Sequence, residues 1–257
     1  MSKRRGQPSR KPSQQRQRQD RRGAEDHQFL HLSAQNALQA PQKEKIDRTP
    51  IRALNERQKL YIEAVKNFMV TLSTGCAGTG KTWVCTALAA EMLDSGEIDK
   101  IVITRPAVEA GENLGFLPGE LEEKFDPYLQ PFRDVLNKRL GKSYVNALIK
   151  SGKIEAAPLA YMRGRTFGER VFVILDEAQN TTPEQMKMFL TRIGNGCKVV
   201  VNGDTTQKDI KGISGLKDAV NRISWIPCVK HVHFEREHVV RSGFVQEVIE
   251  SYERDDE

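Results

Sequence analysis

The 257-residue sequence has no long hydrophobic run. A membrane-spanning helix needs about 18 or more consecutive apolar residues, and no stretch of that kind occurs. The basic first residues are followed by glutamine and arginine instead of the apolar stretch of a secretory signal. We therefore expect a cytoplasmic protein without a membrane partner.

Cysteine is scarce as well, with 4 in the chain and no C-x-x-C pair among them. The four are Cys76, Cys85, Cys197 and Cys228. This spacing carries no zinc signature and no disulfide framework of the secreted type. The sequence thus predicts reduced, structural thiols.

Apolar residues are nearly absent from residues 1–23, which are rich in arginine and glutamine. Such a segment cannot bury enough surface to fold, so we expect a disordered tail over residues 1–48 and a folded domain over residues 49–257. Residues 1–50 hold 12 Lys or Arg against 5 Asp or Glu, whereas the rest of the chain holds 28 against 29. The tail can bind RNA or DNA electrostatically, and the alternatives are a protein partner or a solvated arm with no specific partner.

Eight consecutive residues match the phosphate-binding pattern G-x-x-x-x-G-K-[ST]. They are Gly75, Cys76, Ala77, Gly78, Thr79, Gly80, Lys81 and Thr82. The glycines let backbone N–H groups turn toward phosphates, Lys81 supplies a point charge, and the Thr82 hydroxyl can bind Mg²⁺. The pattern lies between an apolar strand predicted at residues 68–72 and a helix predicted at residues 83–93, whose N-terminus would face the anion. Together these features predict a binding site for a nucleoside triphosphate.

Predicted strands alternate with predicted helices along the folded part of the chain. Further strands are predicted at residues 101–104, 171–175 and 198–201, helices at 132–140 and 183–193, and a Gly- and Pro-containing irregular stretch at 105–131. This alternation indicates an α/β fold with a mostly parallel sheet and helices on both faces. Ligands of such folds bind at the carboxyl ends of the strands.

Polar residues follow two of these strands directly. Asp176 and Glu177 come after the strand at 171–175, where one carboxylate can bind Mg²⁺ and its neighbour can orient or deprotonate a water molecule. Asp204 and Gln207 follow the strand at 198–201, and an amide there can contact the γ-phosphate or the attacking water. The alternative for the second pair is a turn in which an aspartate caps a bend. The acids indicate hydrolysis of the bound nucleotide.

These motifs resemble a known set. DEAQ at residues 176–179 and GDTTQ at 203–207 resemble the Walker B motif and motif III of superfamily 1 helicases. Longer strings resemble the PhoH family of ATPases: TRPAVEAGENLGFLPGELEEK (104–124), YMRGRTF (161–167), VILDEAQNTTPEQMKMFLTRIG (173–194) and VVRSGFVQEVIESY (239–252). The resemblance covers about residues 50–252.

The resemblance implies a RecA-like core that uses ATP with Mg²⁺ and assembles as a homo-oligomer, often a hexameric ring. It implies that Lys81 and Thr82 serve the phosphates and Mg²⁺, and that Asp176 serves the metal. Glu177 would be the catalytic base and Gln207 the γ-phosphate sensor. The sequence departs from the family pattern at Cys76, which the loop should tolerate because the backbone binds phosphate. It departs again at Asn202 and Lys208, where the family is usually less polar, and these residues bear on how the sensor is coupled to the site.

Two further roles follow from the same resemblance. Gln58 matches a position that reads adenine in related helicases, and the alternative is an ordinary surface glutamine on a helix. A phosphoryl-transfer site also uses an arginine at the γ-phosphate, and this single core has no second motor domain to supply one. Arg241 is the first candidate for an arginine supplied by a neighbouring subunit. Arg105, Arg163 and Arg165 are the alternatives.

The helicase-like motifs imply single-stranded RNA or DNA as a partner. In the segment 161–167, Tyr161 and Phe167 are interleaved with Arg163 and Arg165, a combination that can bind a strand by stacking and charge. The alternative is a loop that packs against a neighbouring subunit. Two functions stay open: an ATPase that acts on or unwinds single-stranded nucleic acid, and an ATP-switched clamp that hydrolyses slowly and does not unwind. A kinase would conflict with a glutamate placed to activate water.

Overall fold

The computed structural model describes residues 44–106, 121–240 and 243, without the side chains of residues 121–128. The predicted tail therefore lies outside the described residues up to residue 43. Within the described residues, none of the helices is long and apolar enough to span a bilayer.

The centre of the fold is a parallel sheet in the order β3-β2-β4-β5-β1-β6. Its strands are β1 (Val70–Gly75), β2 (Lys100–Arg105), β3 (Ile154–Pro158), β4 (Val171–Leu175), β5 (Lys198–Gly203) and β6 (Val229–Phe234). The inner strands are buried along their length, which explains their nearly continuous runs of β-branched and other apolar residues. The carboxyl ends of β1, β4 and β5 lie next to one another because these strands are neighbours in the sheet.

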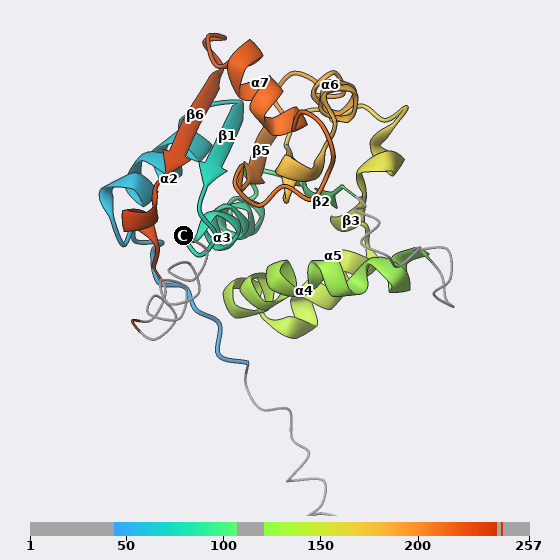
Figure 1. Ribbon diagram of the computed structural model, residues 1–257. Coiled ribbons are helices and arrows are strands. Elements are labelled where there is room, and N and C mark those ends of the chain that lie inside the picture. The colour runs from blue at the N-terminus through green and yellow to red at the C-terminus, as the bar shows by residue number, and fades with distance from the viewer. Residues whose placement is uncertain (1–43, 107–120, 241–242, 244–257) are drawn as a thin grey trace, which may run out of the picture. The chain divides into compact units, whose positions relative to one another are not determined.

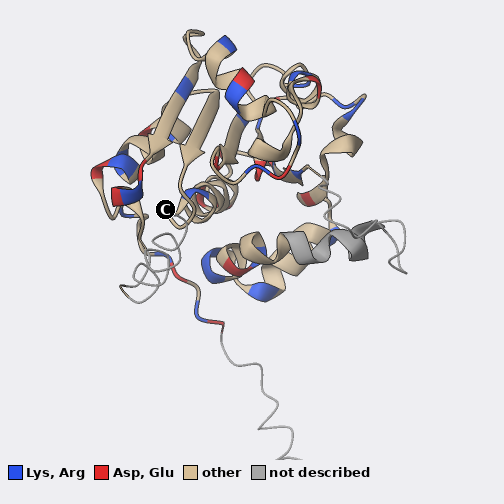
Figure 2. Ribbon diagram, in the orientation of Figure 1, with Lys and Arg blue, Asp and Glu red and all other residues tan. Residues whose placement is uncertain are grey.

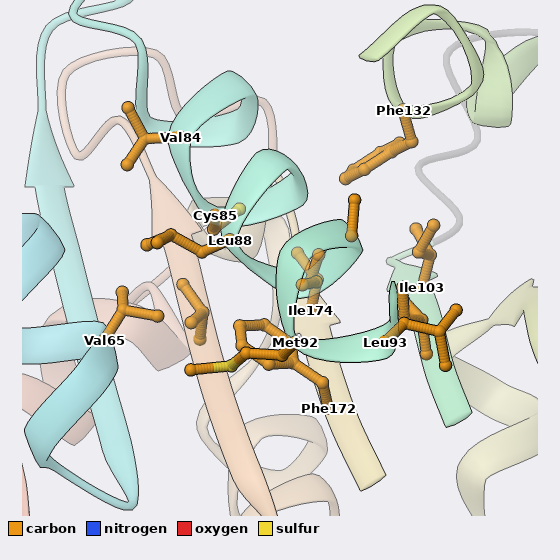
Figure 3. Close-up of a cluster of buried hydrophobic side chains, with 14 of the residues drawn as sticks. Val65, Val84, Cys85, Leu88, Met92, Leu93, Ile103, Phe132, Phe172 and Ile174 are labelled. Atoms are coloured by element: carbon orange, nitrogen blue, oxygen red, sulfur yellow. The ribbon is translucent and has the colours of Figure 1, made fainter. Parts of the chain in front are cut away.

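Helices cover both faces of this sheet (Figure 1). The helices are α2 (Glu56–Asn67), α3 (Lys81–Asp94), α4 (Leu121–Leu140), α5 (Lys142–Lys150), α6 (Pro183–Leu190) and α7 (Gly215–Ile223), with short 3₁₀ turns at Leu159–Met162, Ala178–Asn180 and Arg236–His238. Helices α2 to α5 share one hydrophobic cluster with the sheet, and part of that cluster is drawn in Figure 3. Helices α6 and α7 share a second cluster with the opposite face. The predicted α/β fold, with a parallel sheet and helices on both faces, is confirmed.

Two parts of the expected pattern need correction. The irregular stretch predicted up to residue 131 is helical from Leu121, so α4 begins well before the predicted Phe132. Pro127 and Pro131 disfavour a helix locally, but α4 packs against α3 through side chains such as Phe132 and Leu136, which are buried. The edge strands β3 and β6 and the helices α2, α5 and α7 were not predicted as elements.

The four cysteines are free thiols, as predicted. Cys85 and Cys197 are buried, and burial raises the pKa of each to about 12. Thiols with such a pKa stay protonated near neutral pH and are unreactive.

Candidate nucleotide site

The phosphate-binding pattern forms a tight loop between the end of β1 and the first turn of α3 (Figure 1). Gly75 has a φ of +112°, and a Cβ placed there would lie 1.8 Å from the backbone oxygen of Phe234. Gly80 is the N-cap of α3 with a φ of +86°. These left-handed conformations suit glycine, and they direct the loop across the N-terminus of a 14-residue helix. Such a helix terminus favours anions.

A cavity of about 290 Å³ opens at this loop. Its lining is Ala77, Gly78, Thr79, Gly80, Lys81, Thr82, Trp83, Asp176, Glu177, Gly203, Asp204 and Gln207. The structure thus brings the loop together with the predicted groups that follow β4 and β5. Trp83 is an addition that the sequence did not indicate, and its side chain is partly exposed.

Lys81 is tied to its own loop. Its Nζ donates to the backbone oxygens of Gly75 at 2.6 Å and Cys76 at 2.7 Å. Burial lowers the pKa of Lys81, and the nearby carboxylates of Asp204 and Asp176 oppose that change. The ammonium group is therefore positioned by carbonyl groups at the loop and is poorly hydrated there, which strengthens its attraction for a phosphate.

Asp176 and Thr82, the two residues predicted to bind the metal, lie in contact. Asp176 is buried at the end of β4, and the Thr82 hydroxyl donates to its Oδ1 at 3.2 Å. A hydroxyl beside a carboxylate suits Mg²⁺. In proteins this ion usually keeps several water ligands and is coordinated by one or two carboxylates together with phosphate oxygens of the substrate.

Arg105 lies beside the same carboxylate, which the sequence did not predict. Its Nη2 donates to Asp176 Oδ2 at 2.7 Å and lies 3.7 Å from Glu177 Oε1. The guanidinium also lies over the ring of Phe132, at 5.6 Å from its centroid. Arg105 therefore interacts with the acid pair of its own subunit.

Glu177 is held in a left-handed backbone conformation with a φ of +54°. Such a conformation is uncommon for glutamate and is typical of constrained functional positions. Its Oε2 accepts a hydrogen bond from Gln179 Nε2 at 2.7 Å. The Gln179 Oε1 in turn accepts from the backbone N–H of Asp204 at 3.0 Å, and Asp204 Oδ2 accepts from the N–H of Ala77 at 3.0 Å. This chain of contacts connects the predicted base with the phosphate-binding loop through the segment after β5.

The segment after β5 contains both a turn capped by an aspartate and a glutamine that lines the cavity. Asp204 Oδ1 accepts hydrogen bonds from the N–H and the hydroxyl of Thr206, so an aspartate does cap a turn. Gln207 nevertheless lines the cavity on that turn. Asn202 is fully buried below it, where its amide accepts from Tyr61 and Ser73 and donates to Cys85. Lys208 is directed to the carbonyl of Gly212.

The remaining predictions concern Gln58, Arg241 and the segment 161–167. Gln58 is 3% exposed and is not a surface residue. Arg241 lies outside the described residues. Arg165 forms two hydrogen bonds with Glu155 and Phe167 is buried, whereas Tyr161 and Arg163 are exposed.

A family model described as "PhoH-like protein" matches residues 50–253. The chain belongs to the PhoH family. It is 50% identical over 210 residues to Protein PhoH of Escherichia coli K12, a match that covers 80% of this chain and 59% of that protein. It is 46% identical over 231 residues to the PhoH-like protein of Synechocystis sp., covering 88% of this chain and 70% of that one. The PhoH-like protein of Bacillus subtilis is 48% identical over 206 residues, covering 79% and 64%.

The PhoH chain described here spans about three fifths of the length of its E. coli relative. Among solved structures, it is similar to the DUF1998 helicase MrfA bound to DNA, with a TM-score of 0.43 at 11% identity over 76% of this chain and 30% of that one. The Pif1 helicase of Candida albicans gives a TM-score of 0.35 at 13% identity, over 77% of this chain and 43% of that one.

Proposed function

We propose that this PhoH chain binds ATP with Mg²⁺ and hydrolyses it, and that single-stranded RNA or DNA stimulates the hydrolysis. The single observation that carries the proposal is one cavity lined by the phosphate-binding loop, Asp176, Glu177 and Gln207. Phosphoryl transfer uses groups of these kinds together, and their presence in one cavity supports the proposal.

The loop and Lys81 would hold the β- and γ-phosphates at the N-terminus of α3. Thr82 and Asp176 would hold Mg²⁺, which neutralises charge on the phosphate oxygens when bound. Glu177 would accept a proton from the attacking water. Two observations support this role: Glu177 lines the cavity, and its backbone is held in an unusual conformation. Gln207 would contact the γ-phosphate from the segment that follows β5.

The contact between Gln179 and both Glu177 and Asp204 supports coupling of the base to the sensor segment. We further propose a homo-oligomer, with a hexameric ring as the first candidate, in which Arg241 reaches the γ-phosphate of a neighbouring subunit. Arg105 is less suited to that role, because it already pairs with Asp176 in its own subunit.

The test is ATP turnover by the wild type and by Glu177→Gln, each with and without single-stranded RNA and DNA. Glu177→Gln should retain ATP binding and lose turnover by about 100-fold or more, since a general base contributes about 10² to 10⁴ in rate. Glu97→Gln is the matched control, because Glu97 is an exposed glutamate beyond the far end of α3. Equal turnover by wild type and Glu177→Gln would remove the proposed base.

The nucleic-acid part has its own readout. Stimulation of turnover by a single strand supports the ATPase that acts on nucleic acid, whereas ATP-dependent strand binding without stimulation supports the clamp. Tyr161→Ala and Arg163→Ala should each weaken strand binding, since both side chains are exposed after β3. Tyr144→Ala is the matched control, as Tyr144 is exposed on α5 and belongs to no proposed site.

A further inference from the structure

The side chain of Gln58 contacts the phosphate-binding loop directly. Its Nε2 donates to the backbone oxygen of Thr79 at 2.9 Å. Its Oε1 accepts from the backbone N–H of Leu54 at 2.9 Å. Both distances are ordinary for amide hydrogen bonds, so both ends of the amide are engaged within the protein.

The loop is shaped to receive this side chain. A Cβ placed on Gly80 would lie 2.8 Å from Gln58 Nε2, a distance that real Cβ contacts do not show. The glycine of the motif therefore provides room for Gln58 in addition to its left-handed conformation. Gln58 is absent from the described residues that line the cavity of about 290 Å³. Its amide lies against the loop and outside that cavity.

Helix α2 holds Gln58 at a fixed distance from the loop. Asn55 caps the helix by accepting from the Gln58 N–H at 2.8 Å, and its own Nδ2 donates to the oxygen of His238 at 3.2 Å. One turn further on, the buried Tyr61 donates its hydroxyl to Asn202 at 2.8 Å and lies 3.3 Å from the oxygen of Lys81. The helix is thereby connected to the loop, to β5 and to the segment after β6.

We infer that Gln58 is a positioning residue, which fixes the phosphate-binding loop through the Thr79 carbonyl and does not read the adenine base. The inference rests on the proposed nucleotide binding. The amide still has a second N–H and a second oxygen lone pair, but at a position that is 3% exposed and outside the cavity it could present them to a base only by leaving Thr79 and Leu54. Gln58 should therefore contribute equally to the affinity for every ligand that places a triphosphate in the loop.

The experiment compares three probes that share a triphosphate: ATP, GTP and inorganic tripolyphosphate, each with Mg²⁺. Their affinities for wild type and Gln58→Met are measured by calorimetry. Gln58→Met keeps the length of the side chain without adding charge, and it removes the hydrogen bonds to Thr79 and Leu54. Leu60→Ala is the control on the same helix, since Leu60 is 48% exposed.

Loss of affinity by a similar factor, about 5- to 50-fold, for all three probes supports the inference. A loss confined to ATP overturns it and leaves the proposed nucleotide binding intact. Unchanged affinities for all three also overturn it. If the wild type binds none of the probes, the proposed function itself fails.

A measurement on the wild type keeps the inference testable if Gln58→Met does not fold. The Leu54 amide should remain protected from hydrogen exchange when ATP is added, and to the same degree as with tripolyphosphate, because Gln58 Oε1 stays in place. Loss of that protection with ATP alone would show that the glutamine leaves the loop for the base, which overturns the inference.

Discussion

At the scale of residues, the carboxylate proposed for the metal is shared with a cation of the protein. Arg105 Nη2 lies 2.7 Å from Asp176 Oδ2, while Thr82 donates to the other oxygen. The Asp176 side chain is 5% exposed, so water screens this charge pair weakly. A metal ion at this carboxylate must therefore act against the positive charge of Arg105.

Arg105→Ala should lower the Mg²⁺ concentration needed for half-maximal nucleotide binding several-fold, because it removes a competing cation. Arg105→Lys keeps the charge and should shift that concentration less. The measurement is nucleotide affinity as a function of Mg²⁺, which does not depend on turnover. An identical Mg²⁺ dependence in all three proteins would mean that Arg105 and the metal do not interact.

The residues of the site differ in how far the sequence predicted them. Lys81, Asp176 and Glu177 were identified because each stands at a fixed place in a motif next to an apolar strand. The pair formed by Arg105 and Asp176 joins residues 71 positions apart, and only the adjacency of β2 and β4 brings them together. Local spacing carries no information on such a contact, so no role for Arg105 within its own subunit was predicted.

At the scale of elements, strand β3 is held at the edge of the sheet by charge as well as by backbone hydrogen bonds. Glu155 of β3 forms an ion pair with Lys100 of β2 at 2.7 Å and a bidentate pair with Arg165. The hydrogen bond from Arg165 is the main reason why the pKa of Glu155 falls from 4.5 to about 2. Glu155 thus fixes β3 and the loop that carries Arg165.

Glu155→Gln should lower the free energy of unfolding at neutral pH by about 1 kcal/mol, as expected for a partly exposed bidentate pair. Because the pKa in the folded state lies below that of the unfolded state, the stabilisation is present above about pH 4.5 and is lost as the pH falls toward 2. Urea unfolding from pH 7 to pH 3 measures it. The difference between wild type and variant should shrink with acid, and a constant difference would contradict the assignment.

The elements that escaped prediction share a physical reason. The inner strands were evident because burial on both faces requires a continuous apolar run. Strand β6 reads VKHVHF and is exposed at Lys230 and His233, so it carries a weaker apolar signal. Helix α4 contains two prolines, and its packing against α3 outweighs the local preference. The secondary structure of these segments is therefore determined by tertiary contacts more than by local sequence preference.

At the scale of the whole molecule, the excess positive charge belongs to the first part of the chain, whereas residues 51–257 are nearly neutral. Among the described residues, Figure 2 shows Lys and Arg interspersed with Asp and Glu. The residue at which the basic first part is cut off decides whether a truncation also removes contacts of the folded domain. Asp47 donates its N–H to the oxygen of Lys138, and Arg139 donates to the oxygen of Thr49. Residues 47–49 are therefore attached to α4, and a truncation that removes them disturbs the domain.

Deletion of residues 1–43 should leave ATP turnover and the melting temperature unchanged, because it spares these contacts. It should weaken binding of single-stranded RNA by about tenfold or more at about 50 mM salt, and the difference should fall sharply by about 200 mM, since released counterions supply most of such binding. Deletion of residues 1–50 should in addition lower the melting temperature, because it removes the groups that contact α4. Fluorescence anisotropy with labelled RNA at several salt concentrations separates these effects. A loss of affinity that does not change with salt would show that the first residues make specific contacts in place of a general electrostatic one.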